Sequence, residues 1–479
     1  MVIRGFLAER WRGDGGYREL LKLALPLIVS AGLWSVQGFV DRMFLTWYLG
    51  KAAAASMQGG VAGFALVALF SHTAVYSNTF VAQYVGAGSP RRVGTAVWQA
   101  IFFGVASGLV LLAVSPLGGP LFRLVGHSAE MQALETTYFR ITVGGAGFLV
   151  LGSALGSFFT GRGDTVTVML VMAGSVVVNI GLNYLWIFGH GGFPEMGLSG
   201  AAWATVVAFF VRAVVYFALM MRRKHRETFG TVSECRFDKE LFIRLMRFGV
   251  PSGLTATLDI LVWALFLFLI GRLGDTESIA AAVAFNINAL AFMPMLGVGI
   301  AVSTLVGRRQ GQKKPGLAAR TTWSALHLTL LYMCVLAALY VLMPKVFMSP
   351  FAAQADPEEF RPVAALTIVV LRIVALYTVF DGMTIVFLSA LKGAGDTRFP
   401  LIAATGLSWA VLVIPSWGLY FTGHRSVYVT WWLASAYIIV LAFVMLLRFI
   451  GGKWRAMRVI EEVVPHVPPH PSVPPTEVE

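Results

Sequence analysis

Acidic side chains inside long apolar runs are the residues of this sequence that could do chemistry. Asp381 stands within LTIVVLRIVALYTVFDGMTIVFLSA, eleven residues before Lys392. At about 1.5 Å per helical residue it lies about 15 Å deep, near the middle of a hydrocarbon layer about 30 Å thick. A carboxylate there costs about 2.5–3.5 kcal/mol on insertion scales, so such residues usually face a cavity or a transport path. Asp41 and Asp259 occupy two other apolar runs in the same way.

Asp41 shares its depth with polar residues of two later runs. Asn179 and Asn183 are spaced i, i+4 and therefore lie on one face of a helix. Asp41, Asn183 and Thr205 all fall about 10–14 Å below the outer surface at about 1.5 Å per residue. One carboxylate with amide and hydroxyl oxygens at one depth suits a proton or a hard cation such as Na⁺. Alternatively, Asn179 and Thr205 only join helices through hydrogen bonds, as polar residues do in membrane bundles.

A second acidic set lies in the later part of the chain. Asp259 and Asp381 both come near mid-depth, and Tyr377, one turn before Asp381, can donate a hydrogen bond to it. Two carboxylates that face one cavity should not both stay ionised without a cation, which is a chemical reason to bind one. The alternative is two separate aspartates that snorkel or pair elsewhere.

Arginines and prolines inside the runs are interpreted as structural. Arg140 and Arg372 occupy equivalent positions in two similar segments, and Arg212 is expected to snorkel or to pair rather than to bind substrate. Pro26 and Pro251 predict helix kinks that let a span bend, or kinks that only shape the packing.

Composition places the chain in a membrane. Of its 479 residues 57% are hydrophobic and 13% are charged, whereas soluble proteins carry about 25% charged residues. The net charge of +13 arises from loops between apolar runs, which indicates membrane topology and not nucleic-acid binding. The two cysteines offer neither a disulfide framework nor a metal spacing, and no catalytic motif is present. The sequence therefore predicts neither an enzyme nor a bound cofactor.

Twelve apolar runs are long enough to span a membrane as helices. They lie near residues 20–48, 53–84, 94–116, 136–159, 166–188, 198–221, 241–270, 278–306, 318–343, 363–391, 399–421 and 426–449. The expected organisation is an N-terminal segment (1–19), a first lobe (20–221), a linker (222–240), a second lobe (241–450) and a Pro-rich, disordered tail (451–479).

The basic residues predict the orientation. One set of loops, with both termini, holds 27 of the 37 Lys and Arg residues; the opposite loops hold six, and four lie within spans. By the positive-inside rule both termini, the linker and the tail are cytoplasmic.

The chain repeats itself at a nearly constant offset. GRGDT at 161–165 recurs as GAGDT at 393–397, 232 positions later, and Pro26 matches Pro251 at an offset of 225. VAQYVG at 81–86 matches VSTLVG at 302–307 at an offset of 221. Since each half has six spans, both halves enter from the same side. The predicted fold is all-α: twelve transmembrane helices as two parallel six-helix repeats around a central cleft.

Together these motifs resemble those of the multidrug and toxic compound extrusion (MATE) transporters, of the bacterial NorM-like type. The resemblance covers residues 20–450 and also rests on Asn179-xxx-Asn183 and on Tyr377-xxx-Asp381 followed by LKGAGDTRFP. It implies a secondary active antiporter of the bacterial inner membrane that expels amphipathic, often cationic compounds in exchange for H⁺ or Na⁺. A monomer in contact with membrane lipid is expected, with Na⁺ possible only at the coupling residues.

The resemblance also implies two coupling sites. The first comprises Asp41, Asn179, Asn183 and Thr205, and the second Asp259, Tyr377 and Asp381. The sequence departs from the family twice: Asn183 replaces a second carboxylate of some members, and Asp259 replaces a glutamate of many bacterial members. The alternative function is a flippase for lipid-linked oligosaccharides in the same superfamily, which would need a more basic cavity than the few arginines within spans provide.

Overall fold

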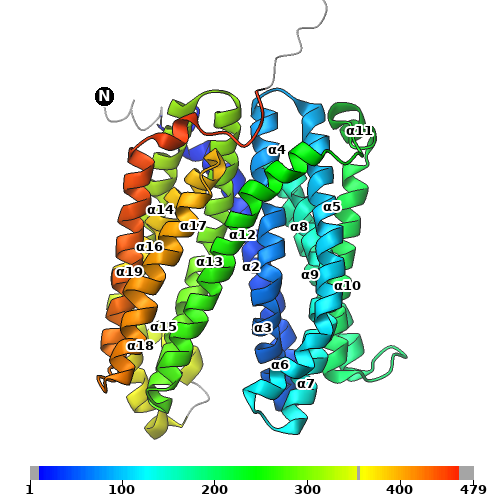
Figure 1. Cartoon of the computed structure of the whole chain (residues 1–479). Coiled ribbons are helices and arrows are strands. Elements are labelled where there is room, and N and C mark those ends of the chain that lie inside the picture. The colour runs from blue at the N-terminus through cyan, green and yellow to red at the C-terminus, as the bar shows by residue number, and fades with distance from the viewer. Residues whose placement is uncertain (1–9, 353–355, 463–479) are drawn as a thin grey trace, which may run out of the picture.

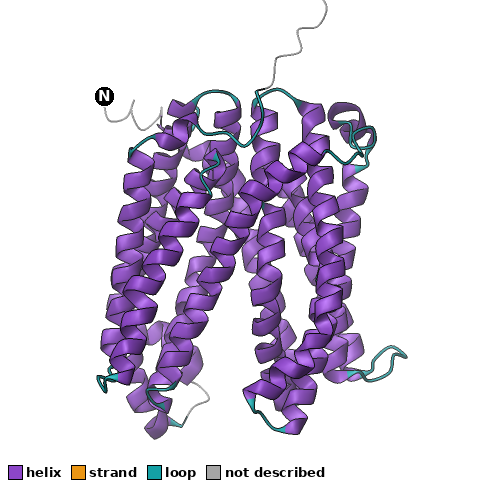
Figure 2. Cartoon of the chain, viewed as in Figure 1, coloured by secondary structure: helices purple, strands orange, loops and turns teal. Residues whose placement is uncertain are grey.

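A computed structural model describes residues 10–352 and 356–462 of the chain. All regular secondary structure in these ranges is helical, and no strand occurs in them (Figure 2). The all-α prediction is confirmed.

The elements follow one another as α2 (Tyr17–Tyr48), α3 (Gly50–Val75), α4 (Ser77–Gly86), α5 (Pro90–Val114), η1 (Ser115–Leu117), α6 (Gly118–Val125), α7 (Ala129–Gly145), α8 (Gly147–Gly161), α9 (Thr165–Phe188), α10 (Gly197–Met220), α11 (Arg223–Phe229), α12 (Lys239–Gly271), α13 (Asp275–Gly311), α14 (Pro315–Leu342), α15 (Pro344–Ala352), α16 (Pro357–Ala394), α17 (Arg398–Leu407), η2 (Ser408–Val413), α18 (Ile414–Phe421), α19 (Val427–Ile450) and η3 (Lys453–Ala456).

Twelve helical stretches among the described residues are long and apolar enough to cross a membrane, which confirms the predicted number of spans. Several spans are interrupted: Tyr76 separates α3 from α4, Ala146 separates α7 from α8, and η2 inserts a π-helical turn between α17 and α18. Large apolar side chains such as Leu170 and Leu331 are exposed on the outside of the bundle. Exposed apolar surface on this scale indicates contact with lipid.

The chain folds into two halves with separate apolar cores. The first-half core gathers buried residues of α3 to α10, and the second-half core gathers those of α12 to α19. Both ends of the described chain lie at one end of the bundle, called here the terminal face (top in Figure 1). From there the helices of the two halves spread apart toward the opposite end (Figure 1).

The first helix of each half begins in the core of the other half. In α2, Leu20 and Leu27 pack in the second-half core, whereas Leu45 packs with α9 and α10. In α12, Leu241 lies in the first-half core and Phe266 in the second-half core. Helices α2 and α12 therefore cross between the halves on the side of the terminal face.

Pro26 and Pro251 occur at these two crossings, inside continuous helices. Ser30 donates a hydrogen bond to the Pro26 carbonyl oxygen at 2.8 Å, and Thr255 donates to the Pro251 carbonyl oxygen at 2.8 Å. Each proline removes a backbone N–H from its helix, and the equivalent hydroxyl four residues later is a matched feature of the two repeats.

The halves hold each other through polar contacts on the side of the terminal face. Asn78 of α4 donates to Thr304 of α13 at 2.9 Å, and Tyr76 donates to the Lys392 carbonyl oxygen at 2.8 Å. Near the chain start, Arg309 binds Glu19 at 2.8 and 2.9 Å. Among the described residues, every hydrogen bond found between the two halves lies on this side.

The predicted disordered tail needs correction in part. Residues 451–462 pack against the bundle, and Trp454 of η3 is fully buried. The prediction followed the proline content, but the prolines begin only at Pro465. Residues 463–479, and residues 1–9 of the N-terminal segment, lie outside the described residues.

Candidate functional site

The acidic residue of the first half is joined directly to the polar residues predicted to accompany it. Asp41 lies in the half of α2 that is distant from the terminal face, and the Nδ2 atom of Asn183 in α9 donates a hydrogen bond to its Oδ1. Asn183 is fully buried and Asp41 is half-buried. A hydrogen bond to a carboxylate is stronger than one between neutral groups, so Asn183 fixes the position of this charge.

The hydrogen bonds continue from Asn183 into α10. The Nδ2 atom of Asn183 also donates to Oδ1 of Asn179 at 3.2 Å, and Nδ2 of Asn179 approaches Oγ1 of Thr205 at 3.5 Å. Thr205 in turn donates to the Ala201 carbonyl oxygen at 3.1 Å. The structure thus brings together all four residues of the first set, which belong to three different helices, α2, α9 and α10.

One acceptor in this cluster has no partner. The Oδ1 atom of Asn183 is buried and accepts no hydrogen bond from any described residue. A buried polar atom without a partner costs about 1–3 kcal/mol. A proton on Asp41 or a hard cation beside it would supply what this oxygen lacks, because both are attracted to oxygen acceptors.

The acidic residues of the second half form a looser group. Asp259 of α12 is exposed and Asp381 of α16 is half-buried, and they lie close enough for their charges to interact. Tyr377 is buried, but no hydrogen bond joins it to Asp381 among the described residues. The second set is therefore assembled from two helices without the fixed hydrogen bonds of the first.

Sequence reasoning missed a cation beside this group. Lys392 at the end of α16 lies close enough to Asp259 for their charges to interact, and its backbone carbonyl accepts the bond from Tyr76 of the first half. The sequence suggested only that Lys392 marks the end of a span. Its position links the acidic group of the second half to the contact between the halves.

Arg212 lies in a different environment from the one expected from the sequence. It is buried and does not reach the surface, and it has no carboxylate partner among the described residues. Its guanidinium lies over the rings of Phe209 and Trp34, 5.2 and 5.8 Å from their centroids. The expected snorkelling or ion pair is wrong, because cation–π contacts with two stacked rings take its place.

Arg140 and Arg372 are both exposed. The only hydrogen bond found for Arg140 among the described residues is a weak one to the Pro116 carbonyl oxygen, at 3.5 Å. Neither arginine contacts the acidic groups, which agrees with a structural interpretation.

Comparison with known proteins follows the same division into halves. The sequence matches the family described as MatE over residues 26–185 and 251–417. A probable multidrug resistance protein NorM from Thermotoga maritima is 25% identical over 449 residues, covering 92% of this chain and 94% of that protein. The multidrug resistance protein PmpM from Pseudomonas aeruginosa is 27% identical over 400 residues, with 82% of each protein covered.

Solved structures share the fold. A MOP superfamily transporter from Pyrococcus furiosus superposes with a TM-score of 0.82 at 19% identity, covering 93% of this chain and 98% of that one. A multidrug resistance MATE family transporter in an outward-facing conformation gives the same TM-score, identity and coverage. The two six-helix halves described above are therefore a known architecture.

Proposed function

Because the chain belongs to the MatE family, we propose that it is a secondary active antiporter that exports amphipathic and cationic compounds in exchange for H⁺ or Na⁺. The names of its relatives support the export of drugs, since they are multidrug resistance proteins. Those names do not favour the flippase alternative. We propose no cofactor beyond the coupling ion, and a monomer as the transporting unit.

The observation that carries the proposal is the contact between Asp41 and Asn183. A carboxylate inside an apolar membrane bundle costs free energy, so its presence there points to a functional role. The adjacent unpartnered Asn183 oxygen gives the site an acceptor that only the loaded state would use. We assign ion coupling to the first set, Asp41, Asn179, Asn183 and Thr205, and to the second, Asp259, Tyr377 and Asp381.

The distribution of charge supports an orientation. The 27 basic residues on the side of the termini, against six on the other, favour a terminal face in the cytoplasm of a bacterial cell. The contacts between the halves then lie on the cytoplasmic side. With this orientation, we assign the structure to the outward-open state of a transporter that works by alternating access.

Transport follows from loading the acids in this state. An ion from outside neutralises Asp41 or the Asp259–Asp381 group, the helices that cross between the halves repack, and the substrate leaves outward. A potential of 100 mV supplies about 2.3 kcal/mol per charge moved inward, enough for about fifty-fold accumulation if one charge moves per cycle.

Efflux of a fluorescent organic cation from cells tests the proposal. Asp41→Asn and Asp381→Asn should each reduce efflux at least tenfold at unchanged expression. The matched control is Asp275→Asn, at an exposed position at the start of α13. Efflux that survives in both variants would rule out this coupling mechanism. Purified protein in vesicles, with sodium and pH gradients imposed separately, identifies the ion.

A further inference from the structure

The chain crosses from one half to the other a last time after its final span. Residues 451–462, called here the C-terminal strap, leave α19 in the second half and run along the terminal face toward α4 and α5 of the first half (Figure 1). This segment contains none of the predicted transport residues. It also has no counterpart in the first repeat, because α10, which corresponds to α19, is followed by the linker.

One end of the strap is anchored in the second half. Trp454 is fully buried, its ring stacks on Phe449 with the centroids 4.8 Å apart, and its Nε1 donates to the Phe449 carbonyl oxygen at 2.7 Å. Gln310 of α13 donates to the Trp454 carbonyl oxygen at 2.8 Å. With α19 only a few residues away along the chain, this end moves with the second half.

The other end is inserted in the first half. Val459 and Ile460 are buried in the first-half core, and the Val459 N–H donates to Oε1 of Gln83 in α4 at 3.0 Å. The Nε2 atom of Gln83 donates across the contact between the halves to the Gly393 carbonyl oxygen at 3.1 Å. The side-chain amide of Gln83 therefore binds both the strap and, across the contact between the halves, Gly393 of the second half.

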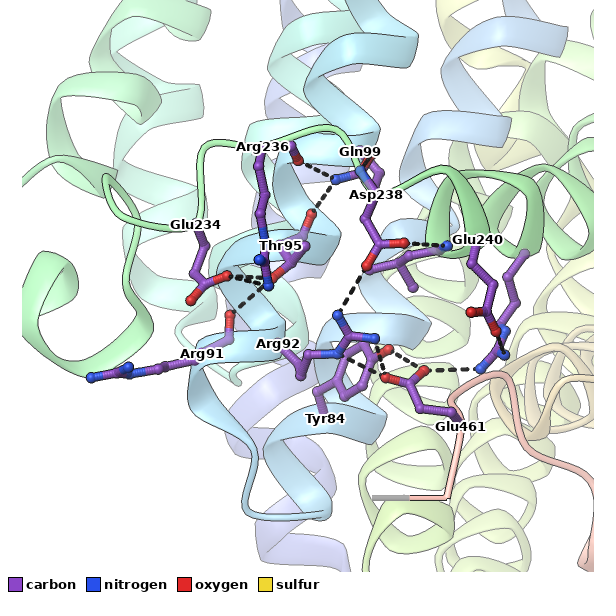
Figure 3. A network of polar contacts seen from close by, with 12 residues as sticks. Tyr84, Arg91, Arg92, Thr95, Gln99, Glu234, Arg236, Asp238, Glu240 and Glu461 are labelled. Atoms are coloured by element: carbon purple, nitrogen blue, oxygen red, sulfur yellow. Dashed lines mark hydrogen bonds and ion pairs between the residues drawn. The ribbon is translucent and has the colours of Figure 1, made fainter. Parts of the chain in front are cut away.

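Glu461 completes the attachment (Figure 3). It accepts hydrogen bonds from Tyr84 at 2.7 Å, from Arg92 at 2.5 and 2.8 Å, and from Arg244 at 2.9 Å. Arg92 also binds Asp238, the residue before α12, at 3.0 Å. Burial acts to raise the pKa of the Glu461 carboxyl, but the hydrogen bonds from Tyr84 and Arg92 outweigh it and lower the pKa. The charged carboxylate is therefore the form that binds.

Chain length limits how far the two ends can separate. Five residues lead from Trp454 to Val459, and they span at most about 18 Å when fully extended. Opening of the terminal face would carry α4 and α5 away from α13 and α19. Because the second-half end is continuous with α19 and anchored by Trp454, separation of the halves beyond this reach releases the first-half end, which is held by Val459, Ile460 and Glu461.

We propose that the C-terminal strap is a conformational latch, which binds the first half through Val459, Ile460 and Glu461 only while the terminal face is closed. It stabilises the outward-open state and must release before the protein can open to the other side. The inference rests on the alternating access proposed above, but not on which ion or compound is transported.

Spin-label distances across the far end of the bundle test the latch. The labels replace Leu124 of α6 and Leu342 of α14, exposed residues of different halves, after Cys235 and Cys334 are changed to serine. Measurements use full-length protein in lipid nanodiscs. Glu461→Gln should lower the ratio of long to short distances about tenfold, equivalent to about 1.4 kcal/mol. Glu462→Gln, at the exposed neighbouring position, should leave the ratio unchanged.

A second variant removes the apolar contact without touching the charges. Ile460→Ser should shift the distances in the same direction, and the double variant should shift them further. The latch is ruled out if Glu461→Gln and Ile460→Ser give wild-type distances, or if Glu462→Gln shifts them equally. A protein that transports nothing would refute the proposed function but would leave this measurement valid, so the two failures are distinguishable.

Discussion

Asn183 donates a hydrogen bond to Asp41 through its amide nitrogen, while the oxygen of the same amide is buried without a partner among the residues that the structure describes. The donor matches a charged carboxylate, and the acceptor would match a protonated one. Rotation of the amide by 180° exchanges the two atoms and lets the same side chain serve both states. The pair can thus hold Asp41 in place before and after it is loaded.

Removal of this amide should change ion coupling more than stability. Asn183→Ala deletes a bond to the charged, unloaded carboxylate, worth about 1.5–3 kcal/mol. The apparent affinity should therefore rise about 10-fold or more if the coupling ion is H⁺, because the ionised form of Asp41 loses its donor, and should fall if the ion is Na⁺, because the Asn183 oxygen is lost as a ligand. Initial efflux rates at varied ion concentration measure the change. Asn286→Ala is the control, because among the described residues the bond found for that exposed amide of α13 is within its own helix, to the Ala282 carbonyl oxygen. Equal effects of the two substitutions would refute a role for Asn183.

The acids of the second half should depend on each other. Asp259 and Asp381 interact through their charges, so Asp259→Asn and Asp381→Asn should not have additive effects on efflux. In a double-mutant cycle, efflux rates converted to activation free energies should give a coupling energy of at least about 0.5 kcal/mol between the two substitutions. Additive effects within error would show that the two carboxylates act separately.

The apolar runs and the repeat predict much of the fold, because burial in lipid requires long apolar helices and duplication places them twice. The equal depth of Asp41, Asn183 and Thr205 likewise predicts residues that the structure joins, since rise per residue converts directly into depth. Periodicity does not predict which core a residue enters: Leu20 and Leu241 look like ordinary span residues yet pack in the opposite half.

The strap and Arg212 were missed for a related reason. Proline content dominates the composition of the tail and conceals Trp454 and Glu461, whose partners lie far away in the sequence. Arg212 has no acidic residue at helical spacing, and only the tertiary structure shows that Trp34 and Phe209 accommodate it.

Close packing of the two repeats at the terminal face should tolerate no added methyl group. A Cβ on Gly311 would stand 2.8 Å from the Gln83 carbonyl carbon, and one on Gly86 would stand 2.9 Å from that of Arg308. Gly311→Ala should therefore overpack this contact and destabilise the state with a closed terminal face by about 1–3 kcal/mol relative to the state in which that face is open. The spin-label pair across the far end reports the shift. Gly316→Ala, where a Cβ meets nothing within 4 Å, should behave as wild type.

Arg212 should matter for its volume more than for its charge. Arg212→Met keeps much of the packing against Phe209 and removes a buried charge for which the described part of the chain offers no carboxylate partner. The free energy of unfolding should therefore change by no more than about 1 kcal/mol. Arg212→Ala leaves a cavity and should cost about 2–4 kcal/mol. Thermal unfolding in detergent compares the two. A larger loss with methionine than with alanine would contradict this account.

The strap should not contribute to the pH dependence of transport. In the closed state the pKa of Glu461 lies below its ordinary value of 4.5, so its binding to Tyr84, Arg92 and Arg244 is fully present above that value. The contribution is lost only as the pH falls through the lowered pKa. Between about pH 5.5 and 8 the efflux of Glu461→Gln should stay in constant proportion to that of wild type. A ratio that changes severalfold over this range would mean that Glu461 titrates there, whereas a constant ratio assigns any pH dependence to other groups.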